Sequence, residues 1–180
     1  TQEEVDAHAV QEPGTQPGDI RYVDVNGDGV INDADRTEIG NPFPKVTIGW
    51  NFGMNYKGWD LAVNTYASIG SSIYRAYERN LNYTNKSASV LGRWTGPGTS
   101  NTEPRVAFID TNNNIRPSDR YVEDGDFFRI NNIQLGYALP ERFVEKAKFT
   151  QIRFYGPVKN AATFTSYSGY TPEISGGVMD

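Results

Sequence analysis

A regular alternation of apolar and polar residues over residues 46–69 is the strongest pattern in the chain. From Val46 to Tyr56 every second residue is apolar or aromatic, and the residues between them are small or polar. A second alternating run extends from Trp59 to Ile69, after the dipeptide Lys57-Gly58. Because side chains on a strand point alternately to two faces, each run predicts a strand, and the short gap predicts a β-hairpin.

The length of these two strands helps to decide whether the hairpin belongs to a membrane barrel or to a soluble domain. Each has about 11 residues, which is long for a globular sheet and matches the number that crosses a bilayer at a tilt. Tyr56 and Trp59 flank the turn, where the aromatic girdle of a membrane barrel lies. A sandwich or barrel hairpin with one wet face fits the same pattern, so periodicity alone leaves both alternatives open.

Residues 127–158 predict two further strands of the same kind. The first is Phe127–Leu139, with Ile133, Leu135 and Tyr137 on one face, and the second is Gln151–Val158. Between them, Pro140–Lys148 predicts a short helical turn with the proline at its start. The expected fold class is therefore all-β, with antiparallel strands.

The other parts of the chain predict loops. Residues 1–45 are polar and acidic, residues 70–126 are rich in Asn, Ser, Thr, Gly and Pro, and residues 159–180 form a tail without a strand. A loop as long as 70–126 is uncommon in a compact domain but normal on the outer side of a membrane barrel. No run of eighteen apolar residues occurs, so no transmembrane helix is expected.

Composition and charge narrow the chemistry. The chain has no cysteine, which excludes disulfide frameworks, thiolate zinc sites and thiol nucleophiles. Its single histidine, His8, lies in a polar, acidic stretch typical of a solvated side chain, which argues against zinc-hydrolase and Ser-His-Asp sites. The net charge of −5 argues against a nucleic-acid surface. Most of the acid lies in residues 1–40, where ten Asp and Glu face only Arg21 and Arg36.

That acidic stretch contains a calcium-type loop, Asp24–Asp35, with the sequence DVNGDGVINDAD. Oxygen donors recur at the loop positions 1, 3, 5, 7, 9 and 12 that wrap one Ca²⁺, and Gly29 stands where the backbone turns sharply. Aspartate replaces the usual glutamate at the last position, so weaker affinity or partial Mg²⁺ occupancy is expected; a metal-free turn is the alternative. The expected ligands are Asp24, Asn26, Asp28, Val30 (through its carbonyl), Asn32 and Asp35.

Four blocks of sequence also carry a family resemblance. They are GDIRYVDVNGDGVINDADRTEIGNPFPKVTIGWNFGMNYKGWDLAVNTYASIG, RWTGPGTSNTEPRV, SDRYVEDGDFFRINNIQLGYALP and FTSYSGYTPEISGG, in this order. Together they resemble the C-terminal part of SusC/RagA-type TonB-linked outer-membrane transporters. RFYGPVKNAATF, Arg153–Phe164, departs from the family's pattern.

The resemblance implies a partial β-barrel in the bacterial outer membrane, with a last strand still to follow. Residues 1–45, 70–126 and 159–180 would then be extracellular, and 46–69 a transmembrane hairpin. The expected function is uptake of glycans or peptides without catalysis. The expected partners are outer-membrane lipid, a SusD-like lipoprotein, and TonB through an N-terminal part outside this chain.

Arg93 and Trp94 are candidate substrate residues that could bind a sugar, although packing within the loop is the simpler interpretation.

Two other function classes are alternatives to a transporter. A soluble calcium-dependent β-domain that binds carbohydrate or protein would bury the apolar rows of 46–56 and 59–69 under a second layer. A surface hydrolase would need a carboxylate pair, but the neighbours Glu123 and Asp124 point to opposite faces of a strand.

Overall fold

The computed structural model describes residues 1–75 and 85–173. The chain divides into two compact units. One, here called the loop unit, comprises Thr1–Ile39 and Arg75–Tyr121; the other, the sheet unit, comprises Gly40–Tyr74 and Val122–Asp180.

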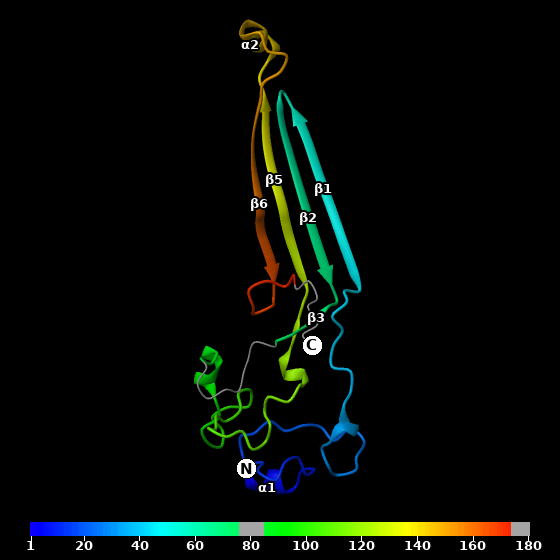
Figure 1. Ribbon diagram of the computed structural model, residues 1–180, viewed down its shortest axis with the longest axis vertical. Coiled ribbons are helices and arrows are strands. Elements are labelled where there is room, and N and C mark those ends of the chain that lie inside the picture. The colour runs from blue at the N-terminus through cyan, green and yellow to red at the C-terminus, as the bar shows by residue number, and fades with distance from the viewer. Residues whose placement is uncertain (76–84, 174–180) are drawn as a thin grey trace. The chain divides into compact units, whose positions relative to one another are not determined.

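The sheet unit is built on four long antiparallel strands in the order β1-β2-β5-β6 (Figure 1). Lys57 and Gly58 both have positive φ and form the turn between β1 and β2, as the hairpin pattern predicts. The strands are β1 (Val46–Tyr56), β2 (Trp59–Ile69), β5 (Phe127–Ala138) and β6 (Arg153–Thr165).

Strand register separates the sheet into an apolar and a polar face. Phe52 pairs with Val63, Val63 with Ile133 and Ile133 with Val158, so one apolar row crosses all four strands. On the opposite face Asn51 pairs with Asn64, Asn64 with Asn132 and Asn132 with Lys159. Apolar and polar residues therefore alternate along each strand, and residues of the same kind stand next to one another across neighbouring strands.

The fourth strand is longer than the sequence predicts. It continues to Thr165 instead of ending at Val158, so residues 159–165 belong to the sheet and not to the tail. Asn160 has a φ of 50°, and the pairing with β5 shifts between Ile130 and Asn132. This bulge interrupts the alternation at Asn160, and the pattern resumes beyond it with Ala162 and Phe164 facing Ile130 and Phe128.

Short elements complete the sheet unit. The predicted helical turn after Pro140 is present as α2 (Glu141–Val144) and the 3-10 turn η4 (Glu145–Ala147), beyond the ends of β5 and β6 (Figure 1). A small two-stranded sheet pairs β3 (Ser72–Tyr74) with β4 (Val122–Asp124).

The loop unit holds little regular structure. Residues 1–19, here called the leader, belong to the predicted N-terminal loop but begin with a short helix, α1 (Gln2–Asp6), which Thr1 and Glu4 cap reciprocally. Three 3-10 turns follow: η1 (Asp33–Asp35), η2 (Ala88–Gly92) and η3 (Asp119–Tyr121). Among the described residues, no helix combines the length and apolar character needed to cross a membrane.

Candidate functional site

The calcium-type loop folds as a series of turns closed by its own side chains. Asp24 accepts hydrogen bonds from the backbone N–H groups of Gly27 (2.7 Å) and Gly29 (2.8 Å), one on each carboxylate oxygen. Both glycines have positive φ, which a Cβ would strain. The spacing of aspartate and glycine thus sets the local path of the backbone.

The closing residue of the loop is held in the same way. The carboxylate of Asp35 accepts from the backbone N–H of Val25 at 2.9 Å and of Asn32 at 2.7 Å. These bonds, led by that from Asn32, keep the pKa of the Asp35 carboxyl below its ordinary value. Asp35 is therefore ionised at neutral pH.

The six predicted ligands lie in one loop, but their side chains turn toward backbone donors. Asn26 accepts from the N–H of Asp28 (2.9 Å), Asp28 from that of Val30 (2.9 Å) and Asn32 from that of Ala34 (2.8 Å). Within residues 1–75 and 85–173, no group of three or more His, Cys, Asp and Glu side chains is arranged to hold a metal ion. The donor set nevertheless suits Ca²⁺, because each carboxylate oxygen here retains lone pairs.

A leader residue pairs with the middle of this loop. The N–H of Val10 donates to the carbonyl of Gly29 at 2.9 Å, and the carbonyl of Val10 accepts from the N–H of Ile31 at 2.8 Å. These contacts form a parallel bridge between Val10 and Val30, and Ile31 is buried beside it. The predicted carbonyl ligand, Val30, therefore lies between the two residues that are tied to the leader.

A buried polar cluster, for which the sequence offers no local signal, holds the loop unit together. Asn112 has no exposed surface. Its amide oxygen accepts from Gln11 (3.0 Å) and Thr15 (2.6 Å), and its amide nitrogen donates to the carbonyl of Ile20 (3.0 Å) and to Asn114 (2.9 Å). One asparagine thus joins leader residues to a loop about a hundred positions away in sequence.

An ion pair next to this cluster makes a second link. The guanidinium of Arg105 donates to both carboxylate oxygens of Asp19, at 2.7 and 3.1 Å. The Asp19 side chain is 1% exposed and that of Arg105 is 17% exposed. Because Asn114 also donates to Asp19 (2.9 Å), the buried carboxylate is well satisfied.

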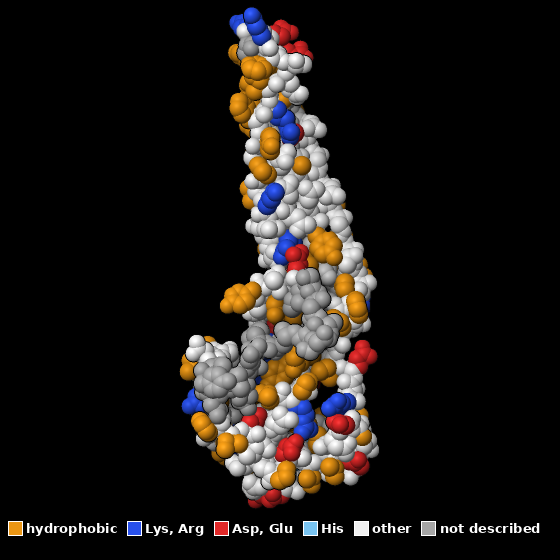
Figure 2. Space-filling view, viewed as in Figure 1, with side chains coloured by type: hydrophobic (Ala, Val, Ile, Leu, Met, Phe, Trp, Pro, Cys, Tyr) orange, Lys and Arg blue, Asp and Glu red, His pale blue; other side chains and the backbone are white. Residues whose placement is uncertain are grey.

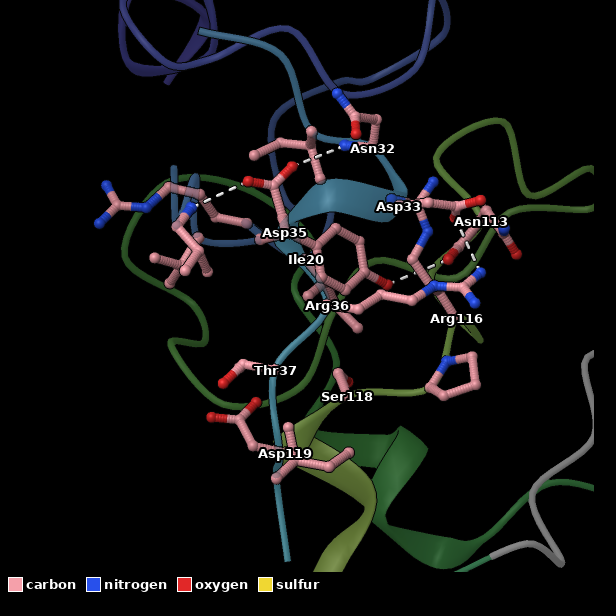
Figure 3. A pocket seen from close by; sticks show the side chains of 17 residues that line it. Ile20, Asn32, Asp33, Asp35, Arg36, Thr37, Asn113, Arg116, Ser118 and Asp119 are labelled. Carbon is pink, nitrogen blue, oxygen red and sulfur yellow. Dashed lines mark hydrogen bonds and ion pairs between the residues drawn. The ribbon is translucent and has the colours of Figure 1, made fainter. Parts of the chain in front are cut away.

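A pocket of about 720 Å³ lies between the C-terminal end of the calcium-type loop, with the residues that follow it, and residues 113–119 (Figure 3). Tyr22 reaches into this region and donates its hydroxyl hydrogen to the carbonyl of Asn113 at 3.0 Å. The Arg116 guanidinium lies 5.1 Å from the centre of the Tyr22 ring. Burial raises the pKa of the Tyr22 phenol above its ordinary value, so this hydroxyl stays a donor.

The two candidate substrate residues have different environments. Trp94 packs against Gly18, where an added Cβ would lie 2.3 Å from the indole ring. Arg93 is exposed, and its Nη1 donates to the carbonyl of Val90 at 3.5 Å. The structure thus brings Trp94 into the packing of the loop unit, while Arg93 remains at its surface.

The two faces of the four-stranded sheet present opposite chemistry. On the polar face Asn64 donates to Asn51 at 2.6 Å, and Arg153 forms an ion pair with Asp60. On the apolar face Trp50, Phe52 and Val158 keep 39–56% of their surface exposed. Figure 2 shows hydrophobic side chains along the edge of the sheet where β6 lies. Among the described residues of the sheet unit, no second layer covers this apolar face.

Comparison with known proteins gives clear relatives. The chain is 35% identical over 163 residues to TonB-dependent receptor P3 of Formosa agariphila, covering 89% of this chain and 16% of that protein. It is 29% identical over 171 residues to TonB-dependent receptor SusC of Bacteroides thetaiotaomicron, covering 94% and 17%. The chain therefore spans about a sixth of the length of these relatives. No protein-family model matches it.

Solved structures share the fold. The RagAB peptide transporter matches with a TM-score of 0.66 at 22% identity, covering 90% of this chain and 18% of that one. The RagAB peptide importer in its closed-closed state matches with a TM-score of 0.62 at 20% identity, covering 92% and 19%. The predicted fold class, antiparallel strands of a partial β-barrel with long loops, is confirmed.

Proposed function

This chain belongs to the SusC-type TonB-dependent receptors, and we propose that the receptor containing it imports nutrients across a bacterial outer membrane. In this proposal β1, β2, β5 and β6 are four strands of the barrel wall. Their apolar face contacts lipid, and their polar face lines the interior. The uncovered apolar face carries the proposal, because a water-soluble β-domain would bury such a row beneath a second layer.

The dimensions of the sheet support this placement. Ten residue steps of about 3.4 Å give β1 a length of roughly 34 Å, or about 26 Å across the membrane at a tilt near 40°. This is close to the roughly 25 Å apolar band of outer-membrane barrels. At the turn end Tyr56, Trp59, Tyr137 and Phe154 stand in register across the four strands, as an interfacial aromatic girdle requires.

In this proposal, the side of the membrane on which each loop lies follows from the direction of the strands. With the Lys57-Gly58 turn and residues 140–149 in the periplasm, residues 1–45, 70–126 and the tail beyond Thr165 are extracellular. The proposed cargo is an oligosaccharide or a peptide, delivered by a SusD-like surface lipoprotein and driven through TonB. Arg93, exposed on the extracellular side, remains a candidate cargo contact, with no covalent chemistry expected.

The transport proposal is tested on the full-length receptor. We expect it to fractionate with the outer membrane and to migrate differently on gels before and after boiling. Cells with the receptor should take up the cargo, and cells that lack TonB should not. Recovery in the soluble fraction without a heat-dependent shift would refute the barrel.

We also propose that the calcium-type loop binds Ca²⁺, or Mg²⁺ more weakly, through the six oxygen donors named above. When bound, the ion would neutralise carboxylates that now accept hydrogen bonds from backbone N–H groups and, in Asp28, from the Asn26 amide as well. Asp24→Ala and Asp28→Ala should each weaken Ca²⁺ binding, measured by equilibrium dialysis of the purified receptor. Asp33→Ala is the matched control, since loop position 10 contributes no ligand; equal binding by all variants would refute the site.

A further inference from the structure

Residues Val10 and Gln11 connect the calcium-type loop to the buried polar cluster of the loop unit. Val10 uses both of its backbone polar groups to pair with Gly29 and Ile31. The next residue, Gln11, uses its whole side-chain amide: the nitrogen donates to Ile20 (3.1 Å) and Asn112 (3.0 Å), and the oxygen accepts from the N–H of Tyr22 (2.6 Å).

We infer that Ca²⁺ binding in the loop Asp24–Asp35 orders the segment 105–121 through Val10, Gln11 and Asn112. This rests on the calcium binding proposed above and adds a regulatory role for the same site. A bound ion would fix the Val30 carbonyl. The same peptide unit carries the N–H of Ile31, which donates to the carbonyl of Val10, so fixing this peptide also restrains Val10.

Movement of Val10 is transmitted to Asn112 because the side-chain amide of Gln11 is hydrogen-bonded through both its nitrogen and its oxygen. This amide cannot shift without breaking bonds to Ile20 and Asn112, and the Asn112 side chain is fully buried with its donors and acceptor engaged. Leaving such buried groups unpaired is costly, so the two ends respond together. The pocket beside Tyr22 is affected as well, since the C-terminal end of the loop and residues 113–119 form its walls (Figure 3).

Limited trypsin digestion of the full-length receptor in outer membranes tests the coupling. The sites are Arg105 and Arg120, which are paired with Asp19 and Glu103 in the folded unit. Coupling between two sites typically changes an equilibrium by roughly 5- to 150-fold. Because cleavage requires local opening of the segment, we expect Ca²⁺ to slow cleavage at these sites by a similar factor, compared with the same membranes treated with a chelator. Cleavage is followed by mass spectrometry of the fragments.

Gln11→Ala separates the coupling from the binding. We expect this variant to bind Ca²⁺ in equilibrium dialysis while its cleavage at Arg105 and Arg120 no longer responds to the ion. Gln16→Ala, which alters an exposed glutamine of the same leader, should respond like the wild type.

The outcomes distinguish the two proposals. Ca²⁺ binding with equal protection in the wild type and Gln11→Ala overturns the coupling and leaves the metal site standing. No Ca²⁺ binding by the wild type overturns the metal site and the coupling with it. If Gln11→Ala fails to reach the membrane, hydrogen exchange of the wild type decides: slowing confined to residues 24–35 overturns the coupling, and slowing that extends to Asn112–Asn114 supports it.

Discussion

Asn112 shows how single residues stabilise the loop unit. Few apolar side chains are buried there, with Ile31 and Tyr121 as the described examples. The interior is instead occupied by amides and a carboxylate whose donors and acceptors are matched. Stability at this scale depends on complete hydrogen bonding, because an unmatched buried polar group costs more than a bond contributes.

Asn112→Ala should therefore destabilise the loop unit by about 2 to 3 kcal/mol, since it leaves the Ile20 carbonyl and the Gln11 amide without this partner. Pulse proteolysis of the receptor in increasing urea measures the change as a lower midpoint. Asn101→Ala, at an exposed position in the same unit, is the control. Equal midpoints for both variants would contradict the role given to the cluster.

The contribution of an ion pair to the stability of the loop unit depends on how deeply the pair is buried. Asp19→Ala leaves Arg105 buried without its carboxylate and should cost about 3 to 5 kcal/mol. Asp33→Ala removes a pair with Arg36 whose side chains are 88% and 80% exposed, and should cost about 1 kcal/mol or less. The same urea and protease assay compares the two variants, and a reversed order would contradict the burial argument.

At the residue scale, the prediction of a metal site depends on local spacing, and metal binding here stays a prediction. The positions of Asp24, Asp28 and Asp35 identify a calcium-type loop because its donors are close in sequence. The orientation of these side chains toward backbone N–H groups is not visible in the spacing. The pairing of Asn112 with Gln11 is also invisible, because tertiary structure alone brings such distant residues together.

At the scale of elements, the strands follow from their pattern. Eleven alternating residues give β1 an unbroken apolar face, and the Lys57-Gly58 turn sets its register with β2. Strand β6 was predicted too short because the bulge at Asn160 puts a polar residue where the alternation requires an apolar one, which interrupts the pattern. Gly136 shows a detail that pattern cannot give: a Cβ there would lie 2.4 Å from Asp60 Oδ1, so glycine leaves room for the Asp60–Arg153 pair.

A charge placed on each face of β1 tests the assignment of the faces. Phe52→Arg puts a guanidinium near the middle of the lipid-facing row and should cost about 2 to 4 kcal/mol of barrel stability. Asn51→Arg, one position away on the interior face, should cost about 1 kcal/mol through the lost bond with Asn64. The fraction of heat-modifiable receptor across a urea series gives both values.

At the scale of the whole molecule, the four strands form an open sheet whose outer edges belong to β1 and β6. Exposed edges and an uncovered apolar face are unfavourable in water. In a closed barrel neighbouring strands would pair with both edges, and lipid would cover the face. Contact between the apolar face of this sheet and lipid is therefore the central proposal.

Nitroxide scanning of residues 46–56 in the reconstituted full-length receptor tests this claim most directly. This chain contains no cysteine, so single cysteines can be introduced and spin-labelled at each position once any others in the receptor are replaced. The account predicts period-two accessibility: oxygen dissolved in lipid reaches labels at even positions such as 50 and 52, and a polar relaxation agent reaches those at 51 and 53. Uniform accessibility, or alternation with the opposite phase, would contradict it.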